Sequence, residues 1–400
     1  MVTFFNFGKM KFSKSKTIIN PLPYRYYFLT VTIITLTGLF DSIYLSISHY
    51  RVYTDMGYQS FCAISQAFNC DTVSQSPYSI LLNVPVPIWG IFGYAIFLIL
   101  LLFAWPQSAL RKRIWTLLFL ISLGFTIYSL FLAYISTYRI QSYCIMCIVS
   151  YGVNLLLLYF TWIVRKRFQC EPFLKAIYLD IRYLLNYPKT MIPVNSVFGI
   201  ATVLMLLYFP AYWQMTPSAL SKNVPTGITE DGHPWIGAEN PELVIVEFSD
   251  YLCFQCKKMH FFLRRIIQEH PDKIRLVHRN FPMDHTINPI VNEPFHAGAA
   301  KLAVVSLFAA QKDKFWEMND LLYNIDRQTG AVNVRDLAKK AGIDFEEMKV
   351  VFRNPNLWIK LQNDIQDGLK YGITGTPGFV INDQVYLGQI PPDILRRFIR

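Results

Sequence analysis

The chain has 400 residues, of which 53% are hydrophobic, 16% aromatic and only 16% charged, so it is too apolar for an ordinary soluble protein of this length. Residues 1–220 carry 16 Lys and Arg against five Asp and Glu, a net charge of +11, whereas residues 221–400 carry 22 of each. The excess positive charge therefore lies in the apolar half and indicates membrane topology, not nucleic-acid binding. The sequence also has no aromatic-basic nucleic-acid module and no Walker-type glycine loop.

Five apolar stretches are long enough to cross a bilayer, which takes about 20 residues. They are residues 27–48, 88–105, 114–138, 144–164 and 192–212. We interpret the first as a retained anchor rather than a removed signal peptide, because it is long and lacks a small-residue cleavage site. Asp41 lies within this first stretch, where it either has a role inside the membrane or sits at the outer interface.

Basic residues flank the five stretches unevenly. Arg51 and Arg139 lie on one side of the membrane if all five stretches cross it. Fourteen lie on the other side: Lys9, Lys11, Lys14, Lys16, Arg25, Arg111, Lys112, Arg113, Arg165, Lys166, Arg167, Lys175, Arg182 and Lys189. The positive-inside rule then predicts a cytoplasmic N-terminus, with the loop 49–87, the loop 139–143 and everything after the fifth stretch outside.

The pattern changes to that of a soluble α/β domain after the fifth stretch. Residues 213–242 contain four prolines and many polar groups, which predicts an external linker. LVIVEF and KIRLVHRNF predict strands, residues 294–370 are helical in pattern, GFVIN and QVYLG predict a closing hairpin, and PPDILRRFIR predicts a final helix.

We therefore predict a multi-domain protein with an all-α transmembrane helix bundle followed by an α/β domain. The bundle has a four-helix core and a fifth, linking span. The predicted parts are a cytoplasmic segment 1–25, the four-helix domain 26–166, a cytoplasmic linker and fifth helix 167–212, the external linker 213–242 and the α/β domain 243–400.

Six of the seven cysteines lie outside on this topology and fall into three local pairs: Cys62 with Cys70, Cys144 with Cys147, and Cys253 with Cys256. An even number of cysteines in an oxidising compartment is typical of disulfide chemistry. A structural disulfide suits the first pair, but a CxxC ring does little to restrict an unfolded chain and is more often redox-active. Cys170 faces the cytoplasm and is predicted to be an incidental free thiol.

A metal site is not predicted. Two CxxC motifs could together supply four zinc ligands. However, one lies at a membrane edge, the other follows a strand in a separate domain, and no His pair stands near either at ligand spacing.

The segment VIVEFSDYLCFQCKKMHFFLRRIIQEH reads as strand, turn, CxxC and amphipathic helix, which is thioredoxin-like. Cys253 would cap the helix, where the helix dipole lowers the pKa of its thiol, and Lys257 and Lys258 would add positive potential. Cys256 would be the buried resolving thiol. Downstream, Pro377 in GITGTPGFVIN could form a cis bond that keeps a backbone edge free for a substrate chain.

Residues 243–400 resemble the DsbA-like thiol oxidoreductases of the thioredoxin superfamily. The matching strings are EFSDYLCFQC, HRNFPMDH, FHAGAAKLA, DKFWEMNDLLY and GITGTPGFVIN. The resemblance implies a buried acid at Glu247 that assists proton transfer; an ordinary edge-strand Glu is the alternative. Phe254 stands where the family commonly has Pro, which leaves the redox poise open. We expect His260 to be a surface residue rather than a catalyst.

Residues 26–166 resemble the vitamin K epoxide reductase (VKOR) family. The resemblance rests on the string CDTVSQSPY from Cys70, with Pro85, Gly90 and the Cys144–Cys147 pair. It implies a quinone-linked disulfide relay in which Cys147 lies next to the quinone. Ser76 matches a position associated with the quinone pocket, and a turn hydroxyl is its alternative. Asn83 replaces a common Gly, and Asn also tolerates left-handed backbone.

Together the two resemblances predict a protein-thiol:quinone oxidoreductase of the inner membrane that forms disulfides in exported proteins, with its thioredoxin-like domain in the periplasm. Electrons would pass from reduced exported proteins to Cys253–Cys256, then to the loop pair, then to Cys144–Cys147 and finally to ubiquinone or menaquinone. Each step is thiolate attack through a mixed disulfide. The expected partners are membrane lipid, quinone and reduced client proteins. Two alternatives stay open: a membrane-tethered disulfide isomerase or reductase, and a non-catalytic membrane-anchored binding or chaperone module.

Overall fold

In the computed structural model of the chain, the described residues are 22–64, 68–105, 112–169, 171–215, 224–325 and 333–399. The chain divides into two compact units, which we call the helical unit and the sheet unit. The helical unit comprises Met1–Ile47 and Cys62–Phe209, and the sheet unit comprises Ser48–Phe61 and Pro210–Arg400. Cys170 and most of the predicted N-terminal segment 1–25 lie outside the described residues.

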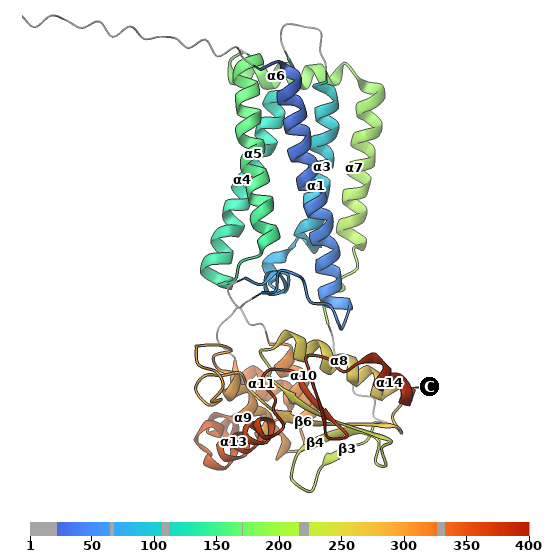
Figure 1. The fold of residues 1–400 in the computed structure, drawn as a ribbon, viewed down its shortest axis with the longest axis vertical. Coiled ribbons are helices and arrows are strands. Elements are labelled where there is room, and N and C mark those ends of the chain that lie inside the picture. Colours follow the sequence, from blue (N-terminus) through green and yellow to red (C-terminus); the bar gives the residue numbers. More distant parts are fainter. Residues whose placement is uncertain are drawn as a thin grey trace, which may run out of the picture. The chain divides into compact units, whose positions relative to one another are not determined.

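Five long apolar helices confirm the five predicted spans (Figure 1). They are α1 (Tyr24–Thr54), α3 (Val86–Phe103), α4 (Trp115–Ile135), α5 (Ile145–Phe168) and α7 (Pro188–Tyr208). A π-helical turn, Ser136–Ile140, extends α4. Their length and composition make the chain an integral membrane protein. The sequence pattern did not predict α6 (Phe173–Leu185), which lies between α5 and α7 in the range taken as a cytoplasmic linker.

Short elements occupy the loop between α1 and α3. They are α2 (Cys70–Ser74), a 3₁₀ turn η1 (Pro77–Ser79), and a small hairpin of β1 (Ile80–Leu81) and β2 (Val84–Pro85). The hairpin turn has positive φ at both Leu82 (52°) and Asn83 (59°), the geometry that matches the twist of a two-residue β-hairpin. Asn83 therefore adopts the left-handed conformation that we predicted it to tolerate.

The interior of the bundle is largely apolar at the end where α1 begins. Tyr24 Oη donates to Ala104 O over 2.6 Å and accepts from Trp115 Nε1 over 2.9 Å, so the start of α1, the end of α3 and the start of α4 meet there. Phe97 and Leu157 are fully buried farther in. α3 and α5 begin at the other end (Figure 1). The cysteines of the helical unit lie there, because Cys144 is the N-cap of α5 and the other three pack with it.

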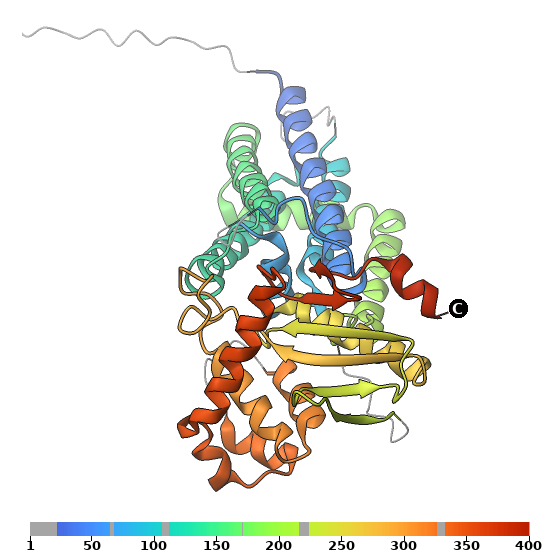
Figure 2. The ribbon, with the colours of Figure 1, turned by 60° about the horizontal axis from the view of Figure 1, so that its bottom comes forward.

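The sheet unit is built on six strands in the order β3-β4-β6-β5-β7-β8 (Figure 2). They are β3 (Thr226–Ile228), β4 (Pro234–Gly237), β5 (Leu243–Ser249), β6 (Ile274–Asn280), β7 (Gly378–Ile381) and β8 (Gln384–Leu387). The central pair, β5 and β6, is parallel, and every other neighbouring pair is antiparallel. β3 and β4 fall within 213–242, so part of the range predicted as a linker belongs to the sheet.

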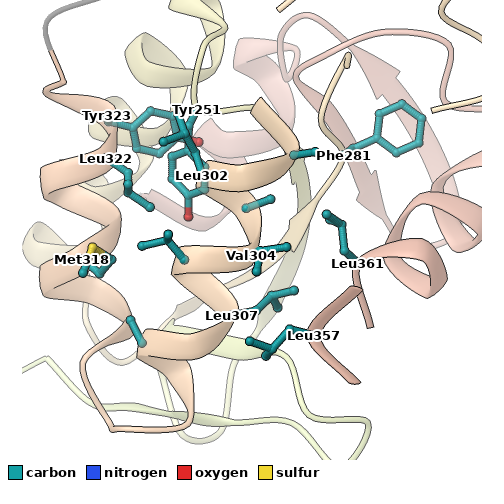
Figure 3. Packing of buried hydrophobic residues seen from close by; sticks show 14 of the residues in the cluster. Tyr251, Phe281, Leu302, Val304, Leu307, Met318, Leu322, Tyr323, Leu357 and Leu361 are labelled. Atoms are coloured by element: carbon teal, nitrogen blue, oxygen red, sulfur yellow. The ribbon is translucent and has the colours of Figure 1, made fainter. Parts of the chain in front are cut away.

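Helices cover both faces of this sheet. They are α8 (Phe254–Glu269), α9 (Ala299–Ala310), α10 (Phe315–Tyr323), α11 (Val334–Ala341), α12 (Phe345–Lys349), the 3₁₀ turn η3 (Val351–Arg353), α13 (Pro355–Lys370) and α14 (Pro392–Ile399). Alternate residues of β5 serve the two faces: Ile245 packs with α8, whereas Phe248 packs in the cluster formed by α9, α10 and α13 (Figure 3).

Candidate redox site formed by three cysteine pairs

The cysteines of the sheet unit lie at the first turn of α8. Cys253 is the N-cap of this helix, with φ −85° and ψ 120°, and its Sγ accepts a hydrogen bond from Cys256 N over 3.2 Å. Both are free thiols; Cys253 is 8% exposed and Cys256 is fully buried. The predicted placement of Cys253 at the helix start and of Cys256 inside is confirmed.

The surroundings separate the pKa values of the two thiols. Burial raises the pKa of Cys253, but the hydrogen bond from the Cys256 thiol, the positive charge of His296 and the Cys256 N–H outweigh it and lower that pKa to about 7. Burial, reinforced by the hydrogen bond and charge of Cys253, raises the pKa of Cys256 well above its usual range. At neutral pH, Cys253 therefore supplies the thiolate and Cys256 keeps its proton.

Sequence reasoning missed the pair Asp250 and His296. His296 Nδ1 lies 2.8 Å from Asp250 Oδ2, and Met283 N donates to the same oxygen over 2.7 Å. Asp250 is 1% exposed. The two residues are 46 positions apart, so no local spacing connects them, and only the folded chain brings the imidazole to the CxxC loop.

Lys258 lies near the start of α8, and its effect on the Cys253 thiol stays a prediction. Its ammonium is buried and donates to Val52 O over 2.9 Å and to Asp55 O over 2.8 Å, so it binds backbone carbonyls of residues 48–61 within the sheet unit. Gln255, between the two cysteines, donates from Nε2 to Met56 O over 3.0 Å. The first turns of α8 therefore bind the segment that precedes Cys62 in the sequence.

Pro377 lies beside the CxxC motif. The Thr376–Pro377 bond is cis, as predicted. Cys253 Sγ donates to Thr376 O over 3.4 Å, and Gly388 N donates to Pro377 O over 2.7 Å. These contacts place the peptide that precedes β7 against the thiol of Cys253.

Glu247 is fully buried on β5, and β5 lies between β6 and β7, so the edge-strand alternative is wrong. The prediction that His260 lies on the surface is also wrong: it is fully buried, and its Nδ1 lies 2.8 Å from Glu247 Oε2. Burial raises the pKa of Glu247, but the charges and hydrogen bonds of His260 and His278 outweigh it and hold that pKa at about 2. Burial lowers the pKa of His260, so near neutral pH the pair is a carboxylate and a neutral imidazole.

The helical unit holds the other two cysteine pairs, each joined by a disulfide. Cys62–Cys70 has a Cα–Cα distance of 5.6 Å, and Cys144–Cys147 one of 5.1 Å. Cys62, Cys70 and Cys144 form one buried cluster, with Cys147 packed against it. The structure therefore brings the two predicted pairs together.

Backbone contacts hold the loop pair against the membrane pair. Phe68 and Tyr143 form an isolated parallel bridge, and Asn69 N donates to Tyr143 O over 3.0 Å. Asn69 also caps α2, since its Oδ1 accepts from Asp71 N and Thr72 N. One residue thus orients the helix that begins at Cys70 and fixes it to the strand-like segment before Cys144.

The two CxxC motifs share one local geometry. Cys144 is the N-cap of α5, with φ −98° and ψ 118°, and its Sγ accepts from Cys147 N over 3.1 Å. Cys253 repeats this arrangement on α8. Cys144 is 3% exposed, whereas Cys147 is half-buried beside the exposed side chains of Ile148 and Val149. Cys147 is thus the more accessible thiol of its pair.

Ser76 and Asp41 were each predicted with an alternative role. Ser76 Oγ donates to Val73 O over 2.7 Å, which fits the turn hydroxyl and leaves its lone pairs able to accept. Asp41 is 8% exposed inside the bundle and accepts a hydrogen bond from Ser150. Leu45, one turn after Asp41 on α1, packs against the buried cysteine cluster.

Two family models match different parts of the chain. Residues 29–162 match the vitamin K epoxide reductase family, and residues 229–400 match a thioredoxin family. The chain therefore carries a VKOR-family membrane domain followed by a thioredoxin-like domain, as both resemblances implied.

Curated relatives match a minor part of their own length. A Na⁺/H⁺ antiporter NhaA 1 of Salinispora arenicola is 22% identical over 38% of this chain and 22% of its own. An antiporter of the same name from Mycolicibacterium vanbaalenii is 23% identical over 42% of this chain and 26% of its own. The chain thus spans about a quarter of the length of these proteins.

Two solved structures with similarity to the chain each match less than half of it. A thioredoxin-like oxidoreductase from Silicibacter pomeroyi is 24% identical, with a TM-score of 0.35, over 43% of this chain and 91% of its own. The thiol-disulfide exchange protein alpha-DsbA2 from Wolbachia pipientis is 21% identical, with a TM-score of 0.34, over 42% of this chain and 85% of its own.

Proposed function

We propose that the chain is a protein-thiol:quinone oxidoreductase that forms disulfides in exported proteins. The observation that carries this proposal is the buried cluster of Cys62, Cys70 and Cys144, with Cys147 packed against it. Structural disulfides do not need to pack against one another, whereas an exchange relay does, because each step requires one sulfur to attack another.

The sheet unit supplies the part that reacts with client proteins. Cys253 is the nucleophile, since the pKa of its thiol is lowered to about 7, and Cys256 is the resolving thiol. The backbone beside Pro377, where Thr376 O contacts Cys253 Sγ, is the binding surface for an extended client chain. Glu247 assists proton transfer, and the buried position of its carboxylate supports this role.

The loop pair passes electrons from the sheet unit to the membrane pair. Cys62 exchanges with Cys253, and Cys70 exchanges with Cys144. The contacts of Lys258 and Gln255 with residues 48–61 support the first exchange, because this segment leads directly to Cys62. The packing of Cys70 and Cys144 in one buried cluster supports the second exchange.

Quinone, either ubiquinone or menaquinone, accepts the electrons at Cys147. A quinone takes two electrons and two protons, which matches the closing of one dithiol. Cys147 is more exposed than Cys144 and is followed by the exposed apolar side chains of Ile148 and Val149, so a lipid-soluble acceptor can reach it. Ser76 contributes to the same pocket as a hydrogen-bonding hydroxyl.

The orientation follows from the charges at the ends of the spans. Lys112, Arg113 and Arg165–Arg167 lie at the end of the bundle where α1 begins, which the positive-inside rule assigns to the cytoplasm. The five candidate spans support a topology in which residues 213–400 are on the same side of the membrane as the two cysteine pairs of the helical unit. In a bacterium with two membranes this side is the periplasm, and the chain lies in the inner membrane.

Exchange trapping tests the order of the relay. In the Cys256→Ser and Cys70→Ser double variant, glutathione disulfide first forms a mixed disulfide with Cys253, and Cys62 then attacks Cys253 and displaces glutathione. The resulting disulfide between Cys253 and Cys62 cannot be resolved by either partner, so it accumulates and is found by mass spectrometry of the digested chain. The matched double variant Cys256→Ser and Cys62→Ser lacks the exchanging thiol and accumulates no such product. Equal products from both variants would contradict the proposed order.

A further inference from the structure

Helix α6 lies at the end of the bundle where α1 begins, between the end of α5 and the start of α7 (Figure 1). One face of α6 is held against the bundle through Ala176 and Asp180, which are buried one turn apart. Asp180 Oδ2 accepts a hydrogen bond from Thr116 N over 3.1 Å, and its Oδ1 accepts one from Gln169 Nε2 over 2.6 Å. These bonds fix the rotation of α6 about its own axis.

The side of α6 that points away from the bundle is apolar. Its side chains are each at least 46% exposed and follow one another at spacings of four, three and four positions: Leu174, Tyr178, Ile181 and Leu185. Residues at these spacings share one side of a helix, and this stripe lies almost opposite Ala176 and Asp180. Only a few residues separate α6 from the spans before and after it, so the stripe lies at the membrane surface, where lipid can cover it.

The charge around α6 is positive. Among the residues that the structure describes, every exposed charged side chain from 165 to 189 is basic: Lys166, Arg167, Lys175, Arg182 and Lys189. The two acidic side chains of this range do not offset them, because Glu171 pairs with Arg113 at 3.2 Å and Asp180 is buried. Such a surface attracts a partner with negative charge.

The basic and apolar side chains of α6 are arranged in order around the helix. Lys175 and Arg182 are seven positions apart, so they point in nearly the same direction, about 80° round the helix from the exposed apolar stripe. The other edge of the stripe is apolar and consists of the partly exposed Phe173, Ile177 and Leu184. Helices that lie in a membrane interface have this arrangement, with apolar side chains among the acyl chains and a basic edge near the phosphates.

The last turn of α5 contributes cations beside α6. The guanidinium carbon of Arg165 lies 4.8 Å from the centre of the Phe173 ring, so the end of α5 contacts the start of α6. Lys166 Nζ lies 4.9 Å from the centre of the Trp162 ring. Aromatic rings beside basic side chains at the end of a span are typical of the level of the lipid headgroups.

We propose that α6 and the last turn of α5 form a binding surface for anionic phospholipid. The acyl chains pack on the apolar stripe, and the phosphate accepts hydrogen bonds from Lys175 and Arg182. A lipid with a neutral headgroup would cover the stripe but leave the excess positive charge of this surface unmatched. The inference uses no cysteine, no quinone and no direction of electron flow, so it stands apart from the proposed function.

Photolabelling of the purified full chain in neutral detergent tests this surface. The probe is a phosphatidylglycerol with a diazirine in one acyl chain, and mass spectrometry locates and quantifies the labelled residues after illumination. Three competitors distinguish the possible sources of binding: unlabelled phosphatidylglycerol, phosphatidylcholine with the same acyl chains, and soluble glycerol phosphate. Raising the ionic strength to about 1 M gives a further measurement, because exposed charges are then screened.

Two double variants with the same loss of charge are compared. Lys175→Gln with Arg182→Gln removes the basic edge of α6, and Lys301→Gln with Lys339→Gln removes two exposed lysines of the sheet unit as a control. We expect the first to weaken phosphatidylglycerol binding about 30-fold, since each Lys or Arg near an anionic surface contributes a factor of about five. The control should match the unchanged chain, and thermal unfolding confirms that each variant is folded.

A third double variant tests the apolar stripe. Leu174→Gln with Leu185→Gln keeps good helix-forming residues but makes the stripe polar. It should weaken labelling of α6 while phosphatidylglycerol remains the better competitor, because the basic edge is unchanged.

In the unchanged chain, we expect label on α6 that phosphatidylglycerol displaces at a concentration at least about tenfold lower than phosphatidylcholine. Glycerol phosphate should not displace it, and high ionic strength should weaken it. Absence of label from α6, equal competition by the two lipids, displacement by glycerol phosphate, labelling that does not depend on ionic strength, or equal labelling in the α6 and control charge variants would each overturn the inference.

Discussion

Cys253 and Cys256 stand three positions apart, yet their thiols have pKa values shifted in opposite directions. The helix start and the burial of Cys256 could be predicted from the CxxC motif and the strand before it. The contribution of His296 could not, since that residue is distant in the sequence. Likewise, nothing local indicates that His260 turns inward, because its partners Glu247 and Asn319 are 13 and 59 positions away in the sequence.

Alkylation of the reduced chain tests the thiolate directly. Because the pKa of Cys253 is lowered to about 7, its reaction with iodoacetamide should be half-maximal near pH 7, and Cys256 should stay unmodified across the same range. The same shift affects folding stability. Because the pKa of Cys253 is lower in the folded chain than in the unfolded one, the reduced fold is stabilised at pH values above the pKa of the unfolded thiol. This stabilisation is lost as the pH falls through about 7. A half-maximal pH above 8.5 would contradict the argument.

His296 should be responsible for part of that shift. His296→Gln removes the positive charge that acts on Cys253, so the pH of half-maximal alkylation should rise by at least about half a unit, as expected for loss of a nearby opposite charge. His285→Gln, at a more exposed imidazole paired with Asp284, is the matched control. Identical profiles for both variants would show that the charge of His296 has no effect.

Asp41 is the residue inside the membrane that most invites substitution. Quinone reduction takes up two protons. Asp41 on α1 lies one turn before Leu45, which packs against the buried cysteine cluster, and its hydrogen-bond donor Ser150 lies one turn after Cys147 on α5. We expect Asp41→Asn to lower the rate of quinone reduction at least about tenfold, measured by absorbance, without changing the release of glutathione from the CxxC. Asp180→Asn, a buried carboxylate at the far end of the bundle that binds Gln169, is the control. A wild-type quinone rate in Asp41→Asn would assign that carboxylate to stability alone.

At the scale of elements, long periodic segments were predicted well and short ones were not. The five spans, β5 to β8 and α14 follow from hydrophobic runs and turn signals in the sequence. β3 and β4 are three and four residues long and lie among prolines, so their composition is typical of a linker. They become strands only in the folded chain, where β4 pairs with β6 and β3 pairs with β4. α6 was also missed, because basic residues stand on both sides of its amphipathic pattern and the whole range was therefore interpreted as a cytoplasmic linker.

Gly237, at the end of β4, shows how closely β4 packs against β6. Its φ is +118°, and a Cβ there would lie 2.0 Å from Ile274 O. We expect Gly237→Ala to lower the free energy of unfolding of the sheet unit by at least about 2 kcal/mol, measured by thermal denaturation. At Gly375 an added Cβ meets nothing within 4 Å, so Gly375→Ala should melt with the unchanged chain. Equal melting of the two variants would mean that β4 can shift without cost.

For the whole molecule, the direction of electron flow decides between an oxidase and an isomerase or reductase. An oxidase must keep its client-facing pair oxidised, so we expect Cys253–Cys256 to be mainly a disulfide in growing cells, as read by alkylation of acid-quenched samples. Phe254, in place of the common Pro, makes this measurement necessary, because the residues between the cysteines set the stability of the thiolate. Mostly reduced thiols would favour the isomerase or reductase.

The joining of a VKOR-family domain to a thioredoxin-like domain in one chain gives the relay its physical basis. Tethering raises the effective concentration of partner thiols towards the millimolar range, so exchange between units does not depend on collision. A non-catalytic binding or chaperone module would need neither the clustered sulfurs of the helical unit nor a thiol with a lowered pKa in the sheet unit.

Quinone-dependent oxidation of a reduced client protein by the purified, intact chain tests the central claim most directly. The account predicts that two client thiols disappear for each quinol formed, that neither change occurs without quinone, and that Cys147→Ser abolishes both while Cys256 and Cys253 remain able to exchange with glutathione. Client oxidation that proceeds at the same rate without quinone, or that survives Cys147→Ser, would contradict it.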